Sequence, residues 1–327
     1  MSRDLRSHDL PGRGSRRACK AVTMHTEPHL VWKAPAGDRF PRPDWSATDA
    51  ALPAGLPDGD LHRVYGALAR QWVDGLRDAL GGGYRVHGGG DWLLLSHECD
   101  RYVELLLQTL RRDRRRIARA LDGLADDDGY GPHVLLLIED LDDYYAYVAH
   151  FYPRHGGAYA QSAGMFVDDG YGHLIVPHRA LEDVEAVTAH ELTHAMLRDL
   201  RLPLWLDEGI ASNMEQAITG RSLYPPEPEL IGRLIEYWRR EGLEPFWSGA
   251  SFARPDQGSE LSYALASHVV AFLGGDYPRF REFARAADPA DAGNAAAREV
   301  YGEDLGALMR RFLGDGDWTP RPATHSR

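Results

Sequence analysis

Two histidines four residues apart constrain the fold more than any other feature of this chain. They occur in "TAHELTHAMLRDLRLPLWLDEG", residues 188–209, as His190 and His194. On an α-helix, positions i and i+4 share a face, so both imidazoles can reach one metal ion. Glu191 points to the side of that face, where it can contact water at the metal without binding the ion. The spacing therefore predicts a metal-binding helix.

A zinc ion in a catalytic site needs a third protein ligand and an open position. Glu208 follows His194 by fourteen residues. A helix that continues to Leu200 extends roughly 9 Å, and a new helix from Pro203 returns roughly 7.5 Å to Glu208. The spacing predicts an antiparallel helical hairpin in which His190, His194 and Glu208 bind one zinc ion per chain.

Each of these residues also has a purely structural explanation. His190 and His194 could be hydrogen-bonded core histidines, and Glu208 could be favoured near a helix start by the helix dipole. An H-E-x-x-H string alone is only moderately specific. The helical context and the returning glutamate make coincidence much less probable, so the zinc interpretation is favoured.

Hydrophobic periodicity predicts an α+β fold with two lobes. Residues 1–58 are rich in Pro, Gly, Arg and Asp and lack periodicity, which predicts a mostly disordered leader. Residues 59–200 form the predicted α+β lobe that ends in the motif helix, residues 201–318 an all-helical C-terminal lobe, and residues 319–327 a tail. The predicted elements are helices at 61–80, 101–124, up to about 151 and at 181–199, strands at 92–96 and 133–138, a hairpin of 164–167 with 173–176, and mostly helix over 203–313.

The charge and cysteine content exclude several classes. A formal net charge of −12 argues against a nucleic-acid-binding protein. The basic run at 111–116 falls in a predicted helix and is interpreted as a solvated face. Cys19 and Cys99 are the only cysteines, which fits a reducing compartment. No apolar run of about eighteen residues and no secretory signal occur, so we expect a cytoplasmic protein without a membrane span.

Other motifs lack the partners that their chemistry needs. His87-Gly88-Gly89-Gly90 is similar to a lipase oxyanion loop, but no G-x-S-x-G nucleophile follows, so we predict a flexible turn. Asp126-Asp127-Asp128-Gly129 lacks the alternation of a calcium loop. These segments carry no functional prediction.

The segments "AHELTHAML" and "LPLWLDEGIASNMEQ" resemble the gluzincin metallopeptidases. The resemblance is greatest to peptidase-MA-like bacterial domains and more distant to the alanyl-aminopeptidases, whose "WLNEGFA" segment matches residues 205–211 with Asp207 in place of Asn. Its motifs are strong over residues 164–215 and only architectural elsewhere. The resemblance implies a thermolysin-like core, in which the hairpin strand borders the substrate cleft and the two motif helices lie beneath it.

The sequence departs from these families at two positions. The aminopeptidases have a Gly-x-Met-Glu-Asn strand where this chain has residues 164–167, and the glutamate that binds the substrate amine is missing. Thermolysin has an Asp that supports a zinc-binding histidine where this chain has Ser212. The first departure argues against aminopeptidase activity, and the second leaves the orienting partner of the histidine unidentified.

The resemblance also implies an oxyanion donor on a downstream helix. Tyr263 in "LSYALASH" is the candidate, with a core tyrosine as the alternative. His268 is a weaker candidate, because a structural histidine explains it as well.

Together these features predict a zinc-dependent hydrolase, most readily a peptidase acting on peptide or protein substrates. His190, His194 and Glu208 would bind the metal, Glu191 would be the general base, and Tyr263 would stabilise the oxyanion. Two alternatives remain open: a non-catalytic metal-binding or scaffold module with the same fold, and a hydrolase of non-peptide amides. The intact H-E-x-x-H favours catalysis, because a purely structural site has no need of Glu191.

Overall fold

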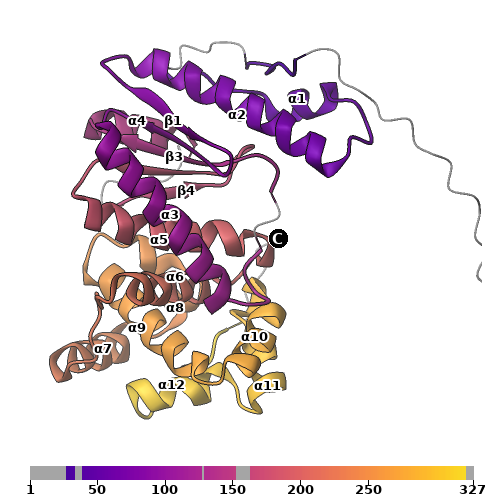
Figure 1. The fold of residues 1–327 in the computed structure, drawn as a ribbon. Coiled ribbons are helices and arrows are strands. Elements are labelled where there is room, and N and C mark those ends of the chain that lie inside the picture. The colour runs from indigo at the N-terminus through magenta and orange to yellow at the C-terminus, as the bar shows by residue number, and fades with distance from the viewer. Residues whose placement is uncertain (1–26, 34–38, 127–128, 152–162, 322–327) are drawn as a thin grey trace, which may run out of the picture.

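The computed structural model describes residues 27–33, 39–126, 129–151 and 163–321, which form a mixed α+β structure (Figure 1). The strands are β1 (Arg85–Gly89), β2 (Trp92–Ser96), β3 (His133–Ile138), β4 (Met165–Val167) and β5 (His173–Pro177). The helices that accompany them are α1 (Trp45–Ala51), α2 (Asp58–Leu80), α3 (Asp100–Ala120), α4 (Leu141–Phe151) and α5 (Leu181–Leu197). The C-terminal helices are α6 (Leu204–Thr219), α7 (Pro228–Glu241), α8 (Glu244–Trp247), α9 (Gln257–Gly274), α10 (Tyr277–Ala286), α11 (Asn294–Tyr301) and α12 (Leu305–Leu313).

The five strands form one mixed sheet in the order β1-β2-β3-β5-β4. The central strands β2, β3 and β5 are parallel, and β1 and β4 pair antiparallel at the two edges. Along β2, Trp92 and Leu94 face one hydrophobic cluster while Leu93 and Leu95 face another. Burial on both faces explains why the central strands are continuous apolar runs in the sequence.

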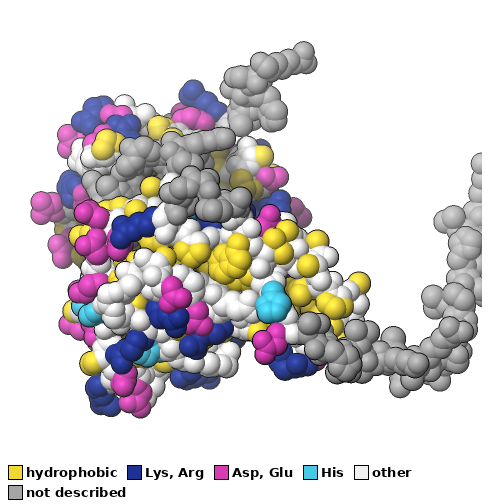
Figure 2. All heavy atoms as spheres, turned by 90° about the horizontal axis from the view of Figure 1, so that it is seen from above, with side chains coloured by type: hydrophobic (Ala, Val, Ile, Leu, Met, Phe, Trp, Pro, Cys, Tyr) yellow, Lys and Arg dark blue, Asp and Glu magenta, His cyan; other side chains and the backbone are white. Residues whose placement is uncertain are grey.

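Helices cover both faces of the sheet (Figure 1). The buried side chains of α2 and α4 pack on one face, and those of α3 and α5 pack on the other. The C-terminal helices lie beyond α3 and α5, away from α2. On the surface seen from the α1–α2 side, charged side chains of both signs are interspersed with hydrophobic ones (Figure 2).

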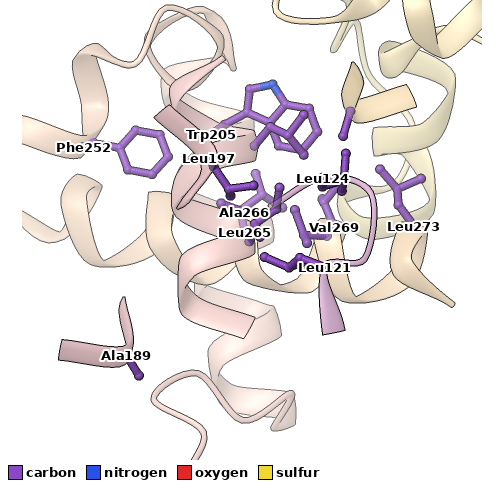
Figure 3. Close-up of a cluster of buried hydrophobic side chains, with 14 of the residues drawn as sticks. Leu121, Leu124, Ala189, Leu197, Trp205, Phe252, Leu265, Ala266, Val269 and Leu273 are labelled. Carbon is purple, nitrogen blue, oxygen red and sulfur yellow. The ribbon is translucent and has the colours of Figure 1, made fainter. Parts of the chain in front are cut away.

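A continuous hydrophobic cluster joins the two predicted lobes. Leu197 at the end of α5 and Trp205 at the start of α6 pack with Leu265 and Val269 of α9 (Figure 3). Leu121, which follows α3, belongs to the same cluster. The two predicted lobes therefore share one hydrophobic core across the boundary near residue 200.

The prediction that residues 1–58 are mostly disordered is wrong for the described part of that segment. Residues 45–51 form α1, Phe40 and Leu56 are buried, and Trp45 contacts the ring of Trp72 in α2. Single buried or aromatic side chains, rather than a face of regularly spaced apolar residues, hold this segment in place. Hydrophobic periodicity therefore could not predict its structure. Cys19 and the rest of residues 1–26 lie outside the described residues.

The prediction of a flexible turn at residues 87–90 is wrong for residues 87–89, while Gly90 lies in the turn between β1 and β2. His87 to Gly89 belong to β1, which pairs with β2. Gly88 has φ 87°, and a Cβ there would lie 2.5 Å from the carbonyl oxygen of Trp92. The glycine therefore permits a tight strand pairing that larger residues would obstruct.

The hairpin predicted from the sequence is confirmed by the antiparallel pairing of β4 with β5. The helical C-terminal region is confirmed as well, from α6 to α12. Among the described residues, no helix combines the length and the apolar character needed to cross a membrane.

Candidate metal centre

The centre is built on a tight connection between α5 and α6. A short 3-10 turn (Arg198–Leu200) follows α5, and Arg201 adopts a left-handed conformation with φ 49°. Pro203 lies directly before the first residue of α6, so its missing N–H costs no helical hydrogen bond. The predicted antiparallel return of Glu208 toward the histidines is confirmed.

The three predicted ligands converge. His190 Nε2 and His194 Nε2 lie 3.2 and 3.5 Å from the same oxygen, Oε2, of Glu208. Ligand atoms about 2.0–2.1 Å from a tetrahedral zinc ion lie roughly 3.3 Å apart, so these separations fit such an ion. The three side chains are only 13–15% exposed. These residues could hold a zinc ion, with one coordination position left for water.

The outward nitrogen of each histidine has a carboxylate partner that the sequence analysis missed. His190 Nδ1 lies 3.3 Å from Glu215, and His194 Nδ1 lies 2.9 Å from Asp207. Such partners fix the tautomer and the orientation of metal-binding imidazoles. Asp207 and Glu215 are thus in a position to orient the two histidines, the role that an aspartate plays in thermolysin where this chain has Ser212. A signal existed in the sequence, since Glu215 lies two helical turns after Glu208 and Asp207 is its neighbour.

The electrostatics of the centre call for a cation. Burial lowers the pKa of His190, but hydrogen bonds with Glu208 and Glu215 outweigh burial and raise the pKa to about 9. Burial is likewise outweighed at His194, whose pKa is raised well above its usual value by Asp207 and Glu208. The carboxylates around both rings therefore favour positive charge at the centre. A divalent cation would supply the same positive charge to neutral imidazoles.

Glu191 lies apart from the ligand group. Its Oε2 accepts a hydrogen bond of 2.7 Å from the backbone N–H of Phe166 in β4. Burial raises the pKa of Glu191, although His190 and His194 oppose that rise. The carboxylate is therefore held between the metal-binding helix and the edge strand.

Tyr263 on α9 reaches the centre, whereas His268 does not. The Tyr263 hydroxyl donates to Oε1 of Glu208 at 3.3 Å. Burial, followed by the charges of Glu208 and Glu191, raises the pKa of Tyr263 well above its usual value, so the hydroxyl remains a donor. His268 instead bonds the carbonyl oxygen of Tyr224 through Nε2 at 2.8 Å. This contact gives His268 a structural role.

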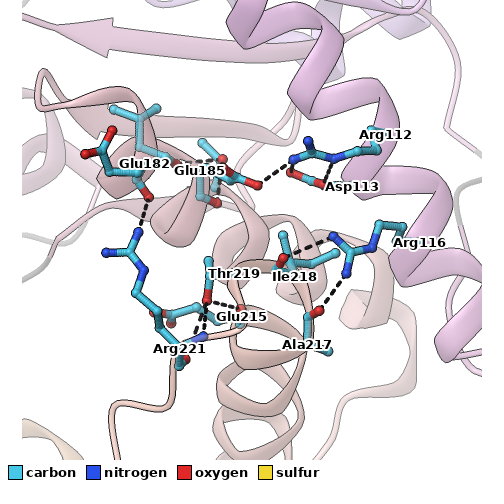
Figure 4. A network of polar contacts seen from close by, with 12 residues as sticks. Arg112, Asp113, Arg116, Glu182, Glu185, Glu215, Ala217, Ile218, Thr219 and Arg221 are labelled. Carbon is cyan, nitrogen blue, oxygen red and sulfur yellow. Dashed lines mark hydrogen bonds and ion pairs between the residues drawn. The ribbon is translucent and has the colours of Figure 1, made fainter.

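Arginines of α3 attach α5 and α6, the two helices of the centre, to the sheet layer (Figure 4). Arg116 donates to the carbonyl oxygens of Ala217 and Ile218 at the end of α6, at 2.7 and 3.0 Å. Arg112 pairs with Glu185 of α5. The basic run of α3 is therefore only partly a solvated face, because two of its arginines connect helices.

A pocket of about 440 Å³ lies near the C-terminal end of α5, and neither the three candidate ligands nor Glu191 lines it. Phe166 of β4 lines it, together with Ala195 and Met196 of α5 and Arg198 after that helix. Phe166 is the residue whose backbone bonds Glu191, and Ala195 follows His194 directly. The pocket therefore shares elements with the centre, namely β4 and α5, but not its site residues.

Searches with the sequence found no matching protein-family model and no curated protein with a significant match. The resemblance to gluzincins therefore depends on the motif residues alone.

Proposed function

We propose that this protein is a zinc-dependent metallopeptidase of the gluzincin type with a thermolysin-like core. The observation that carries the proposal is the convergence of His190, His194 and Glu208 while Glu191 is held separately at the edge strand. A purely structural metal site would not need Glu191, a carboxylate that lies next to the ligands without being one of them.

The protein groups have defined roles in this proposal. When bound, zinc supplies Lewis acidity that acidifies water and polarises a carbonyl group. Glu191 accepts a proton from the attacking water and delivers it to the leaving nitrogen as the C–N bond breaks. The raised pKa of Glu191, caused chiefly by burial, suits such a shuttle. Tyr263 donates a hydrogen bond to the oxygen on which negative charge develops.

The edge strand supports a peptide as substrate. β4 is the last strand of the sheet, and it pairs only with β5 among the described residues. The N–H of Phe166 points away from β5 toward Glu191, so the outer side of β4 borders the centre. An extended peptide could align there by β-augmentation. This arrangement would present a peptide bond to the base.

The same strand argues for internal cleavage. Met165 and Phe166 occupy the positions where the aminopeptidases hold the substrate amine with glutamate. Neither side chain can neutralise an ammonium group, so a free N-terminus gains no ion pair there. We therefore expect endopeptidase activity, or cleavage of N-blocked peptides.

A second candidate is a non-catalytic metal-binding module. The hydrogen bond from Phe166 gives Glu191 a structural partner, which is the observation that favours this alternative. The two candidates differ in turnover rather than in metal content.

The test compares an N-blocked peptide library with aminoacyl anilides. The zinc-loaded protein should cleave the blocked peptides, lose activity with chelator and regain it with added zinc. Turnover of anilides without cleavage of any blocked peptide would contradict the endopeptidase proposal. Zinc binding without turnover of either substrate would favour the non-catalytic module, or a hydrolase of other amides.

A further inference from the structure

A second group of side chains that could hold a metal ion lies at the carboxyl ends of the central strands. Glu98, Glu139 and His178 follow β2, β3 and β5 within two residues of each strand's end. These three strands are parallel and adjacent, so their carboxyl ends meet at one edge of the sheet. Three residues distant in sequence are therefore brought together by the sheet itself.

The distances within this group suit a common ligand. His178 Nε2 lies 2.6 Å from Oε1 of Glu98, and His178 Nδ1 lies 3.4 Å from Oε2 of Glu139. One donor atom from each residue falls within 4.8 Å of the other two. The two carboxylates face different nitrogens of the His178 ring, so binding one ion requires that ring or one glutamate to rotate.

The charges in this group are unbalanced. In the described part of the chain, neither Glu98 nor Glu139 pairs its carboxylate with an arginine or lysine. Arg85 bonds the main-chain carbonyl of Glu98 and pairs with Asp100. A single imidazole therefore faces two carboxylates, and a divalent cation would neutralise the excess negative charge.

The topology independently marks this edge as a place where ligands bind. The chain leaves β2 for α3 and leaves β5 for α5, and the buried side chains of both helices pack on one face of the sheet. The chain leaves β3, between them, for α4, which packs on the other face. Connections that diverge from neighbouring parallel strands leave a crevice at their carboxyl ends, where ligands of open α/β sheets bind.

We propose that Glu98, Glu139 and His178 bind a second divalent cation of the zinc class, independently of the α5–α6 centre. One nitrogen and two carboxylate ligands suit zinc and leave a position for water. The side chains are 23%, 53% and 29% exposed, more than those of the first centre. The second ion therefore binds more weakly than the first and links the ends of β2, β3 and β5.

The test removes the first centre and asks for metal at the second. The double variant His190→Ala/His194→Ala, titrated with zinc by calorimetry, should bind one equivalent and show a higher melting temperature in excess zinc. Adding His178→Ala should abolish both effects, and adding Glu98→Gln should weaken binding at least tenfold. His97→Ala is the matched control, since this neighbouring histidine lies outside the group, and it should leave binding unchanged.

A second measurement applies if the double variant does not fold. Wild-type protein loaded with one zinc ion should take up one equivalent of Co²⁺, seen as visible absorption that Glu98→Gln or His178→Ala removes. The proposal is overturned if no second equivalent binds, or if its uptake persists in these variants. Because neither readout measures hydrolysis, failure here leaves the proposed peptidase activity untouched.

Discussion

The imidazoles of His190 and His194, the candidate metal ligands, have carboxylates beside both ring nitrogens. Nε2 of both rings faces Glu208, while the Nδ1 atoms face Glu215 and Asp207. A carboxylate that accepts a hydrogen bond from Nδ1–H fixes the tautomer in which the Nε2 lone pair is free for a metal. The orientation of the rings is therefore set by residues of α6 rather than by α5 alone.

Loss of these carboxylates should weaken zinc binding. Asp207→Asn and Glu215→Gln should each lower the affinity for zinc by about 10- to 100-fold, because the rings lose a charged partner. The measurement is competition with a chromogenic zinc chelator. Asp183→Asn, at an exposed carboxylate in the first turn of α5, is the control and should bind zinc like the wild type. Wild-type affinity in both Asp207→Asn and Glu215→Gln would show that the contacts do not orient the ligands.

The convergence of His190, His194 and Glu208 was predicted from sequence, whereas the contacts of Asp207 and Glu215 with the histidines were not. His190 and His194 share a helical face by spacing alone, and the distance back to Glu208 follows from the helical rise. The role of Glu215 depends on how α6 is rotated against α5. That rotation is set by tertiary packing, which a spacing argument does not contain.

At the scale of elements, α6 lies between α5 and α9, with extensive packing against both. Gly209, next to the ligand Glu208, allows the approach of α9. A Cβ at Gly209 would lie 2.6 Å from Val270 and 2.7 Å from the carbonyl oxygen of Ala266. The close helix pair also carries Tyr263 to the centre.

Enlarging Gly209 should therefore destabilise the protein. Gly209→Ala should lower the free energy of unfolding by about 1–3 kcal/mol, because the methyl group forces two helices apart. Gly232→Ala is the matched control, since a Cβ at this helical position in α7 has no neighbour within 4 Å. The control should be neutral or stabilising by up to about 1 kcal/mol. Urea unfolding curves measure both, and equal stability of the two variants would contradict the packing argument.

The apolar elements were predictable from the sequence, and the elements with few buried apolar residues were not. The central strands and the β4–β5 hairpin are apolar and were predicted within a residue or two. By contrast, β1 contains Gly88 and Gly89, and α1 buries only Thr48. Such elements form because neighbouring structure holds them, so their own sequence carries little signal.

For the whole molecule, the sheet separates the metal centre from a second buried polar group. His173 in β5 faces away from the centre, toward α4. Its Nδ1–H donates to the carbonyl oxygen of Tyr171, and its Nε2 accepts from the Tyr147 hydroxyl, each at 2.8 Å. Burial lowers the pKa of His173 to about 4, although the bond to Tyr171 opposes the shift. The ring is therefore neutral in the folded protein.

This histidine should make stability depend on pH. Between pH 4 and about 6.5, the unfolded chain binds a proton at His173 that the folded chain does not. The free energy of unfolding therefore rises with pH across this window, by about 3 kcal/mol, and the gain is lost as pH falls toward 4. Urea unfolding of wild type and His173→Gln at several pH values measures the difference in slope. His97→Gln, at an exposed histidine, is the control; equal slopes in wild type and His173→Gln would be inconsistent with the buried neutral ring.

The α+β class and the helical C-terminal region were predictable, but the way the two halves meet was not. The cluster that joins Leu197, Trp205 and Leu265 draws on segments far apart in sequence. Each segment shows only that one of its faces is apolar, and the partner of that face is fixed by tertiary packing. The centre lies where these halves join, on α5 and α6.

Glu191→Gln tests the central claim most directly, because it removes the proposed base while keeping all three ligands and the shape of the side chain. Zinc content and cleavage of the N-blocked peptide library are measured together, with Glu182→Gln on an exposed position of α5 as the control. We predict that Glu191→Gln keeps its zinc and its fold but cleaves at least about 10²-fold more slowly, while the control cleaves normally. A Glu191→Gln protein that retains zinc and cleaves as fast as the wild type would contradict the account.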